Sequence, residues 1–339
     1  MSDPAPPPPP TAAAGTTTTG SAPDAGDAEV VLAIDIGGTK MATGLVTRHG
    51  EVLLRRQVAT PATAGAELLW EVLAALVGEV RADGSRRGAP EPVACGVGCG
   101  GPMTRGGAAV SPVNIPGWRG FALHDHLARL TGLTTVVDND AKALALGEGW
   151  RGAAVGVADY VGMVVSTGVG GGLVTDGRLL DGADGNAGHI GHVIVEPDGH
   201  RCGCGARGCL EAEASGTAIA RITGRPAAEA TPDVVERTGT MVGRAVASVA
   251  VLLDLRLAVV AGSVALGFGD PFFAAAQAEI DRRARLDYAR GTVIRPAGLG
   301  ADGPLVGAAA VAWAHLGDPI LGAAAPRRGG VGADGPPVG

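Results

Sequence analysis

The stretch EVVLAIDIGGTKMATGLV, residues 29–46, places a Gly-Gly-Thr-Lys turn between two apolar runs. Residues 29–36 predict a buried strand, and residues 41–46 predict a second strand after almost no loop, so the glycines form a tight β-hairpin. Residues 160–175 repeat this order of strand, Gly/Thr turn and strand around STGVGGG. The repeat predicts two related halves whose turns face each other and hold the phosphates of one nucleotide.

The first turn carries the groups that phosphate binding needs. Backbone N–H groups at Gly37, Gly38 and Thr39 can surround phosphate oxygens, Lys40 adds a positive charge, and Asp35 can position Mg²⁺. The spacing is not that of the Walker loop, which requires G-x-x-x-x-G-K-[ST] between a strand and a helix. A plain hairpin with a glycine turn is the alternative interpretation.

Three cysteines, Cys202, Cys204 and Cys209, lie close together in a glycine-rich loop. They cannot all pair as disulfides, and they match the soft donors of a tetrahedral zinc site. His192, upstream in a separate turn, completes a Cys3His set. His200 is the rival fourth ligand, but it stands two residues from Cys202 and would strain the loop. We predict structural Zn²⁺, and reduced surface thiols are the alternative.

Asp138-Asn139-Asp140 follows a predicted strand at 134–137 and precedes a predicted helix at 141–150. A carboxylate here can cap the helix, or it can act as a general base at the carboxyl edge of a sheet, where α/β folds place ligands. One Asp can cap while the other serves as the base. Lys142, just inside the helix, is interpreted either as a solvated side chain or as a contact to phosphate.

Composition narrows the class of protein. The chain has 339 residues and a net charge of −7, which gives no electrostatic case for binding nucleic acid or an anionic membrane. The N-terminus lacks a basic region followed by an apolar core, and the best apolar segment, near 249–264, is interrupted by Asp254 and Arg256. Five cysteines, three of them clustered, fit a reducing compartment. We therefore expect a cytoplasmic protein.

Other segments complete the predicted organisation. Residues 1–28, rich in Pro, Ala, Thr and Gly, predict a disordered tail, and residues 317–339 predict a flexible one. Further helices are expected at 66–81, 123–131 and 270–285 with a largely helical region at 215–253, and further strands at 92–98 and 257–261. NIPGW, residues 114–118, is interpreted as a rigid loop that offers an amide and an aromatic ring.

Residues 96–101, GVGCGG, match the dinucleotide fingerprint G-x-G-x-x-G as a string. We reject the match because Pro102 and a glycine-rich loop follow in place of a helix. Cys95 and Cys99 in the same segment are interpreted as small buried residues and not as a redox pair.

Taken together, these pieces resemble the ROK family of sugar kinases and repressors. The resemblance covers residues 31–315 and rests on six motifs in this order: AIDIGGTK (33–40), VNIPGW (113–118), DNDAKALALGE (138–148), STGVGGG (166–172), GHIGH (188–192) and CGCGARGCLE (202–211). It implies a two-domain α/β fold of the actin/hexokinase-like (RNase H-like) ATPase class, with an interdomain cleft and a zinc-bound loop. The implied domains are residues 29–138, completed by a C-terminal helix at 304–316, and residues 139–303.

The resemblance also implies roles for individual residues. Asp140 is the catalytic base. The sugar contacts are Asn114, Asn139, His189, His192 and Glu211, and His192 also binds zinc. Residues 35–40 form the first phosphate element, Thr167 and Gly168 form the second, and Gly262 belongs to the adenosine element. The implied cofactors are ATP, Mg²⁺ and structural Zn²⁺, and the implied assembly is a homodimer or homotetramer.

His189 departs from the family pattern. Family glucokinases usually have Glu here, in E-x-G-H, where two oxygens accept from a pair of sugar hydroxyls; a neutral His offers one acceptor and one donor. The main prediction is an ATP-dependent hexose kinase that phosphorylates the 6-hydroxyl, with glucose as the first candidate. The alternative is a kinase for an amino or N-acyl sugar such as N-acetylmannosamine or N-acetylglucosamine.

Two other classes of protein compete with a kinase. Repressors of the same family carry an N-terminal helix-turn-helix domain, whereas only about thirty non-basic residues precede Asp35, so we expect no nucleic-acid binding. A non-catalytic sugar-binding protein is the second competitor. The presence of Asp35, Asp140 and both glycine turns argues against it.

Overall fold

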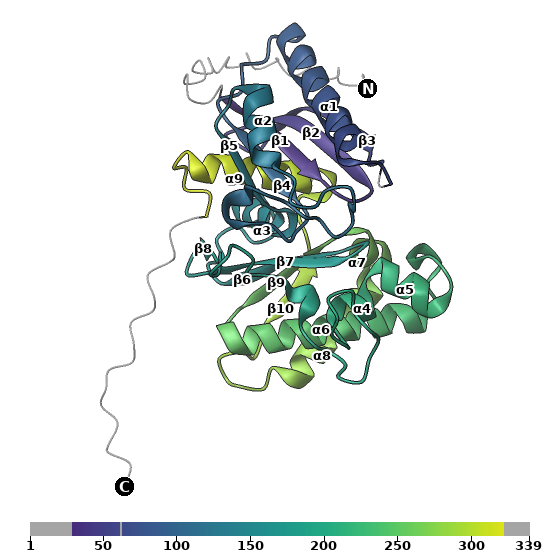
Figure 1. Ribbon diagram of the computed structural model, residues 1–339. Helices are drawn as coiled ribbons and strands as arrows, with labels where there is room; N and C mark the ends of the chain where they lie inside the picture. Colours follow the sequence, from purple (N-terminus) through teal and green to yellow (C-terminus); the bar gives the residue numbers. More distant parts are fainter. Residues whose placement is uncertain (1–28, 62, 322–339) are drawn as a thin grey trace, which may run out of the picture.

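The computed structural model describes residues 29–61 and 63–321, so the predictions for residues 1–28 and for most of 317–339 lie outside the described part. Its framework is two five-stranded sheets, ordered β3-β2-β1-β4-β5 and β10-β9-β6-β7-β8 (Figure 1). The first sheet contains β1 Val30–Ile36, β2 Lys40–Thr47, β3 Val52–Ala59, β4 Cys95–Cys99 and β5 Thr135–Asn139. The second contains β6 Tyr160–Val165, β7 Val169–Thr175, β8 Arg178–Leu179, β9 Leu257–Ala261 and β10 Val293–Pro296.

Helices cover both sheets (Figure 1). They are α1 Ala66–Arg86, α2 Leu123–Thr131, α3 Asp140–Arg151, α4 Leu210–Ala214, α5 Gly216–Thr223, α6 Pro232–Leu253, α7 Ser263–Phe268, α8 Asp270–Arg283 and α9 Gly303–His315. The predicted α/β fold is confirmed, whereas the domain limits and the interdomain cleft stay predictions.

The first sheet carries the first predicted hairpin, because β1 pairs antiparallel with β2. Its strand β1 is apolar along nearly its whole length since both faces are covered: Leu32 packs with α1 and α2, and Val31 packs with α9. β1, β4 and β5 run parallel, and their register aligns Asp35 with Gly98 and Gly98 with Asp138. The carboxyl ends of these strands therefore bring Asp35 and Asp138 to one edge.

The second sheet carries the second predicted hairpin, with β6 and β7 antiparallel and β6, β9 and β10 parallel. Helix α3 lies between the two sheets and contacts β4 as well as β6 and β7 (Figure 1). The glycine run in β7 permits this approach: a Cβ added to Gly172 would lie 2.8 Å from Lys142 Cα. On the other face of the sheet, α6 packs against α8 over a buried apolar cluster.

Several predicted element limits differ from the structure. The strand predicted at 92–98 spans only Cys95–Cys99, and α1 continues past residue 81 to Arg86. Strands β3 and β10 were not predicted, because both are edge strands whose arginines and exposed positions hide an apolar pattern. The helical region at 215–253 is two helices separated by the segment at 224–231.

The start of the predicted flexible tail at residue 317 is wrong for its first residues. Asp318 accepts a hydrogen bond from Arg48 Nε at 2.9 Å, and Ile320 is buried, so this segment is tied to the end of β2. Among the helices of residues 29–61 and 63–321, none is both long and apolar enough to cross a membrane.

Candidate active site

The two predicted phosphate turns face each other across Asn114. A Cβ added to Gly38, in the first turn, would lie 2.5 Å from Asn114 Cβ, so no side chain fits there. A Cβ added to Gly168, in the second turn, would lie 3.7 Å from Asn114 Nδ2. The structure thus brings together three segments that the sequence places far apart, and the glycines make this close approach possible.

The first turn uses part of its own hydrogen-bonding capacity. Gly37 N–H donates to Lys40 O at 3.0 Å and closes the hairpin. Thr60 holds the turn from the side, because its Oγ1 donates to Gly37 O at 2.7 Å and its N–H donates to Thr39 O at 3.0 Å. Of the three N–H groups predicted to meet phosphate, that of Gly37 is already engaged, which leaves those of Gly38 and Thr39. Thr60 is a supporting residue that the sequence analysis missed.

The second turn is held by Glu211. Ser166 N–H donates to Gly168 O at 2.9 Å, and Val169 N–H donates to Glu211 Oε2 at 3.0 Å. One carboxylate oxygen of Glu211, a predicted sugar contact, therefore accepts a hydrogen bond from the turn. The contact connects the turn to the segment that ends in Cys209, two residues before Glu211.

Gly262 lies against the same turn. Its φ of +102° favours glycine, and a Cβ there would lie 2.3 Å from Val165 O. The next residue, Ser263, places its Oγ 2.9 Å from Ser166 Oγ. The predicted adenosine element and the second phosphate turn are therefore in contact.

Asp35 and Asp140 form a pair of neighbouring carboxyl groups. A Cβ added to Gly98 would lie 3.8 Å from Asp35 Oδ1 and 3.5 Å from Asp140 Cα. Burial raises the pKa of Asp35 to about 7, with the Asp140 charge adding to this and Lys40 and Arg55 opposing it. Burial also raises the pKa of Asp140, although the Ala141 N–H and His189 offset part of the effect. Raised carboxyl pKa values at the edge of a sheet are typical of functional sites.

The cap of α3 is Asn139, so the expectation that an Asp caps this helix needs correction. Asn139 Oδ1 accepts from Ala141 N–H at 3.0 Å and from Lys142 N–H at 3.3 Å. Asp140 Oδ1 also accepts from Ala141 N–H, at 2.8 Å. The amide Nδ2 of Asn139 remains as the group that can meet a ligand.

Both interpretations of Lys142 are wrong. Its side chain is 2 % exposed, and its Nζ lies 2.9 Å from Asp138 Oδ1 and 2.7 Å from Asp181 Oδ1. Lys142 is thus neither solvated nor free for phosphate. Lys142 is buried because of a tertiary contact: Asp181, which follows β8, packs against the first turn of α3.

His189 lies beside Asn139. Its Nδ1 lies 2.9 Å from the carbonyl oxygen of Asn186, to which it donates, so in the neutral ring Nε2 carries the lone pair. A Cβ added to Gly101 would lie 3.2 Å from both His189 Nε2 and Asn139 Nδ2. The His189 acceptor and the Asn139 donor therefore both lie against Gly101, where no side chain separates them. The sequence analysis missed Gly101, whose only signal was the glycine-rich string at 96–101.

The predicted metal ligands form a cluster, called the Cys3His cluster below. Cys202 Sγ lies 3.7 Å from His192 Nδ1, and Cys204 Sγ lies 3.7 Å from Cys209 Sγ. All four donor atoms lie within 4.8 Å of one another. A Zn–S bond of about 2.3 Å implies donor atoms about 3.8 Å apart in a tetrahedron, so the donor set and its spacing fit Zn²⁺.

The rival ligand His200 has a different role. Its Nδ1 lies 3.1 Å from Glu213 Oε1 and 3.0 Å from Glu213 Oε2, and Glu213 is fully buried. Arg237 also donates to the backbone carbonyl oxygen of Glu213, at 2.9 Å. These contacts join the cysteine loop to α4 and α6, and it is His192, not His200, that lies with the three cysteines, so His192 stays the predicted fourth ligand.

The cluster adjoins the predicted sugar site. The rings of His189 and His192 lie nearly parallel, at an interplanar angle of 13° and with centroids 6.3 Å apart. The cysteine loop is therefore connected to the site at two points, His192 on one side and Glu211 on the other.

Comparison with known proteins agrees with this arrangement. The model of the ROK family matches residues 31–315. The chain belongs to the ROK family. Among its relatives, the N-acetylmannosamine kinase of Escherichia fergusonii is 39 % identical over 255 residues, which are 70 % of this chain and 84 % of that protein.

Solved ROK structures share the fold. The ROK hexokinase from Thermus thermophilus has a TM-score of 0.73 and 32 % identity, and the match covers 85 % of this chain and 99 % of that one. A ROK family glucokinase from Streptomyces griseus, solved in complex with glucose and AMPPNP, has a TM-score of 0.72 and 31 % identity, with 83 % and 98 % covered. This ROK chain is accordingly a sugar kinase.

One part of the ROK motif VNIPGW does not reach the site. Trp118 is fully buried, its Nε1 donates to Ala66 O at 3.3 Å, and its ring stacks on Phe121 with centroids 4.5 Å apart. The loop therefore offers the Asn114 amide but not an aromatic ring, which corrects the expectation from sequence. Trp118 instead anchors the loop to α1.

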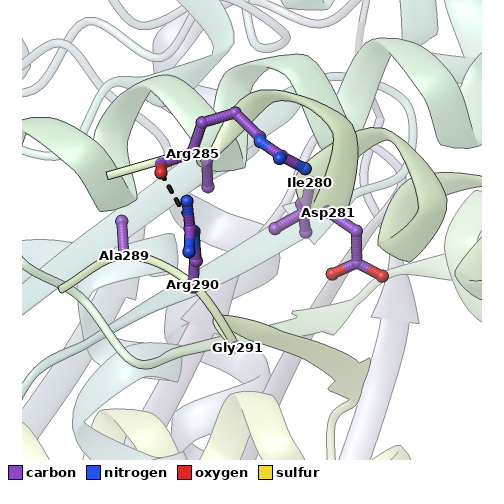
Figure 2. A pocket seen from close by; sticks show the side chains of 7 residues that line it. Ile280, Asp281, Arg285, Ala289, Arg290 and Gly291 are labelled. Atoms are coloured by element: carbon purple, nitrogen blue, oxygen red, sulfur yellow. Dashed lines mark hydrogen bonds between the residues drawn. The ribbon is translucent and has the colours of Figure 1, made fainter. Parts of the chain in front are cut away.

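A surface hollow lies away from these residues, beside the C-terminal end of α8 (Figure 2). It is lined by Ile280, Asp281, Ala284, Arg285, Ala289, Arg290 and Gly291. Arg290 Nε donates to Arg285 O at 3.1 Å across it. None of the predicted site residues of this ROK kinase lines the hollow, so we do not assign it to the reaction.

Proposed function

We propose that this ROK sugar kinase transfers the γ-phosphoryl group of ATP to the 6-hydroxyl group of N-acetylmannosamine. Two observations support the N-acyl sugar over glucose. The curated relative at 39 % identity is an N-acetylmannosamine kinase, and position 189 holds His where family glucokinases usually have Glu. Glucose remains the second candidate, because the Streptomyces griseus glucokinase was solved with glucose.

The two glycine turns are the proposed site for the phosphates of ATP. Gly38 and Thr39 contribute N–H groups on one side, Thr167 and Gly168 lie opposite, and Lys40 adds a positive charge. Gly262 marks the side on which we place adenosine. The complex of the Streptomyces griseus relative with AMPPNP supports a nucleotide at this type of site.

Asp35 is the proposed residue for Mg²⁺. A buried carboxyl group whose pKa is raised to about 7 beside a second carboxyl group is only partly compensated by nearby positive charge, and a divalent cation supplies more. Bound Mg²⁺ would neutralise charge on the transferred phosphoryl group. Lys40 and Arg55, which oppose the rise in the Asp35 pKa, contribute positive charge from the protein itself.

The proposed sugar site lies around Gly101. His189 Nε2 supplies one neutral acceptor, which suits the N–H of an acetamido group, and Asn139 Nδ2 supplies a donor for a hydroxyl or carbonyl oxygen. Asn114, His192 and Glu211 are the further proposed contacts. Asn114 lies beside both glycine turns, so it can align the sugar with the phosphoryl group.

Asp140 is the proposed general base. Its carboxylate accepts the proton of the 6-hydroxyl group as that oxygen bonds to the γ-phosphorus, while the bond from the γ-phosphorus to the bridging oxygen breaks and ADP leaves. The raised pKa makes this carboxylate a better proton acceptor than an exposed one. Most of the remaining catalysis is positioning by the two turns and Asn114.

Zn²⁺ in the Cys3His cluster is proposed to be structural. Its four donors leave no open position, as expected of a site that fixes a loop and does not bind substrate. The loop it fixes carries His192 and leads directly into Glu211, which holds the second turn.

The observation that carries the choice of sugar is the single neutral acceptor at His189. ADP formation is measured with ATP and a panel of N-acetylmannosamine, N-acetylglucosamine, glucose and mannose. We expect the highest kcat/KM with N-acetylmannosamine. A kcat/KM for glucose equal to or above that for N-acetylmannosamine would contradict the assignment of the sugar, and no ADP formation with any sugar would contradict the kinase reaction itself.

A further inference from the structure

Lys142 is buried in the first turn of α3, three residues after Asn139. Its Nζ has three oxygen neighbours: Asp181 Oδ1 at 2.7 Å, Asp138 Oδ1 at 2.9 Å and the carbonyl oxygen of Gly185 at 3.4 Å. Asp181 and Gly185 accept hydrogen bonds from the ammonium group, and Asp138 is its second ion-pair partner. These oxygen neighbours explain how the charge is tolerated at 2 % exposure.

The three acceptors come from two parts of the chain that the sequence separates. Asp138 stands near the end of β5, in the first sheet, beside the proposed base Asp140. Asp181 and Gly185 belong to the segment at 181–188, which follows β8 and leads into His189. Lys142 thus joins this segment, called the 181–188 loop below, to the catalytic edge of the first sheet.

The same loop fixes the orientation of His189. The Asn186 carbonyl oxygen accepts from His189 Nδ1 at 2.9 Å, and Asn186 Nδ2 donates to Met103 O at 3.2 Å. Within the loop, Ala187 N–H donates to Asp181 O at 2.9 Å. Displacement of Asp181 therefore reaches His189 through a short series of hydrogen bonds.

The buried Lys142 ammonium group depends on the Asp181 contact more than Asp181 does. The Asp181 side chain is 61 % exposed and can be solvated by water, whereas Lys142 is 2 % exposed and has to find its acceptors within the protein. Burial alone would lower the pKa of Lys142, but the Asp138 and Asp181 carboxylates outweigh this and raise it, so the charge is present throughout the working pH range.

We propose that Lys142 is a positioning residue for sugar recognition: it holds the 181–188 loop against β5 and thereby sets where His189 Nε2 meets the sugar. This proposal rests on the sugar site proposed above, but not on which sugar is the substrate. It assigns no contact between Lys142 and either substrate.

The test uses Lys142→Met, Asp181→Asn and the double variant in the full-length, metal-loaded enzyme. Arg56→Met is the matched control, since it removes a cation 3.0 Å from the buried carboxylate of Asp83, away from the loop. Hydrogen–deuterium exchange of the 181–188 loop and KM values for ATP and for the best sugar are measured for each. The best sugar is identified beforehand with the sugar panel. If that sugar is glucose, the N-acyl assignment is refuted, but the test of Lys142 can still be carried out with glucose.

Lys142→Met is expected to speed exchange in the loop and to raise the sugar KM about tenfold or more, with the ATP KM changed less than about twofold. Asp181→Asn should raise the sugar KM less, and the double variant should match Lys142→Met, because the two residues act as a unit. The control should leave both KM values unchanged, because Asp83 keeps Arg86 and Arg87 as ion-pair partners.

Three results would overturn the proposal. The first is unchanged exchange in the 181–188 loop of Asp181→Asn, the exposed position at which folding is least at risk. The second is an equal rise of the ATP and sugar KM values in Lys142→Met. The third is a sugar KM in the double variant that rises by the product of the two single-variant factors, because this would mean that Lys142 and Asp181 act independently.

Discussion

Replacing His189 by Glu changes the hydrogen bonding of the proposed sugar site without removing a side chain from it. In the parent, Nδ1 is bound to the Asn186 carbonyl oxygen at 2.9 Å, so Nε2 is the one acceptor left for the sugar. A carboxylate offers two acceptor oxygens and a negative charge, which suits a pair of hydroxyl groups better than an acetamido group. The variant His189→Glu should therefore move preference from the N-acyl sugar toward glucose.

The size of the change follows from one charged hydrogen bond. Such a bond contributes about 1.5–3 kcal/mol, which corresponds to roughly a ten- to hundredfold change in kcat/KM for each sugar. The new negative charge also lies near Asp140, whose pKa is already raised by burial. A negative neighbour raises it further, so the acidic limb of the pH–rate profile should shift to higher pH.

The assay is kcat/KM for N-acetylmannosamine and for glucose, measured as ADP release across pH 5–9. His189→Gln is the control, because it keeps a neutral acceptor and adds no charge. The reasoning about this position would be refuted if the ratio of the two kcat/KM values in His189→Glu stayed within about twofold of the parent ratio and the acidic limb of the pH–rate profile did not move.

Three further predictions test the rest of the site. The pKa of Asp35 rises from 3.8, its ordinary value, to about 7 in the fold, so its ionisation destabilises the fold as pH rises between these values. Asp35→Asn should remove this loss of stability, which reaches about 4 kcal/mol above pH 7 without added Mg²⁺. Equal slopes of unfolding free energy against pH in the parent and the variant would contradict this prediction. Gly38→Ala should separate the turns at Asn114 and raise the ATP KM, whereas Gly65→Ala, whose Cβ meets nothing within 4 Å, should not; equal ATP KM values would count against the facing turns. Zinc removal by a chelator should expose the three cysteines of the Cys3His cluster to a thiol reagent and leave Cys95 and Cys99, both 0 % exposed, unreactive in the folded protein; rapid reaction of the cluster before chelation would argue against bound metal.

Features made of neighbouring residues were predictable from the sequence. The two hairpins and the cysteine loop each place their chemistry within a short stretch, so the two sheets and the Cys3His cluster could be expected before the structure. The edge strands β3 and β10 could not, because their exposed arginines and short lengths obscure the pattern that buried strands show.

Contacts between distant residues were not predictable. Lys142 pairs with Asp181, 39 residues further along the chain, and lysine is so rarely buried that solvent was the natural expectation. Thr60 and Gly101 are ordinary residues in sequence and gain importance only from what folds against them. Trp118 is the reverse case: its motif predicted an aromatic ring available to a ligand, but the ring is buried in the core.

The central claim is that one carboxylate removes the proton of the sugar hydroxyl during phosphoryl transfer. Its most direct test is kcat for Asp140→Asn with the best sugar and saturating ATP, in protein shown to keep its melting temperature and its metal. The account predicts a fall of about a hundredfold or more with little change in the ATP KM. A variant that turns over as fast as the parent would contradict it.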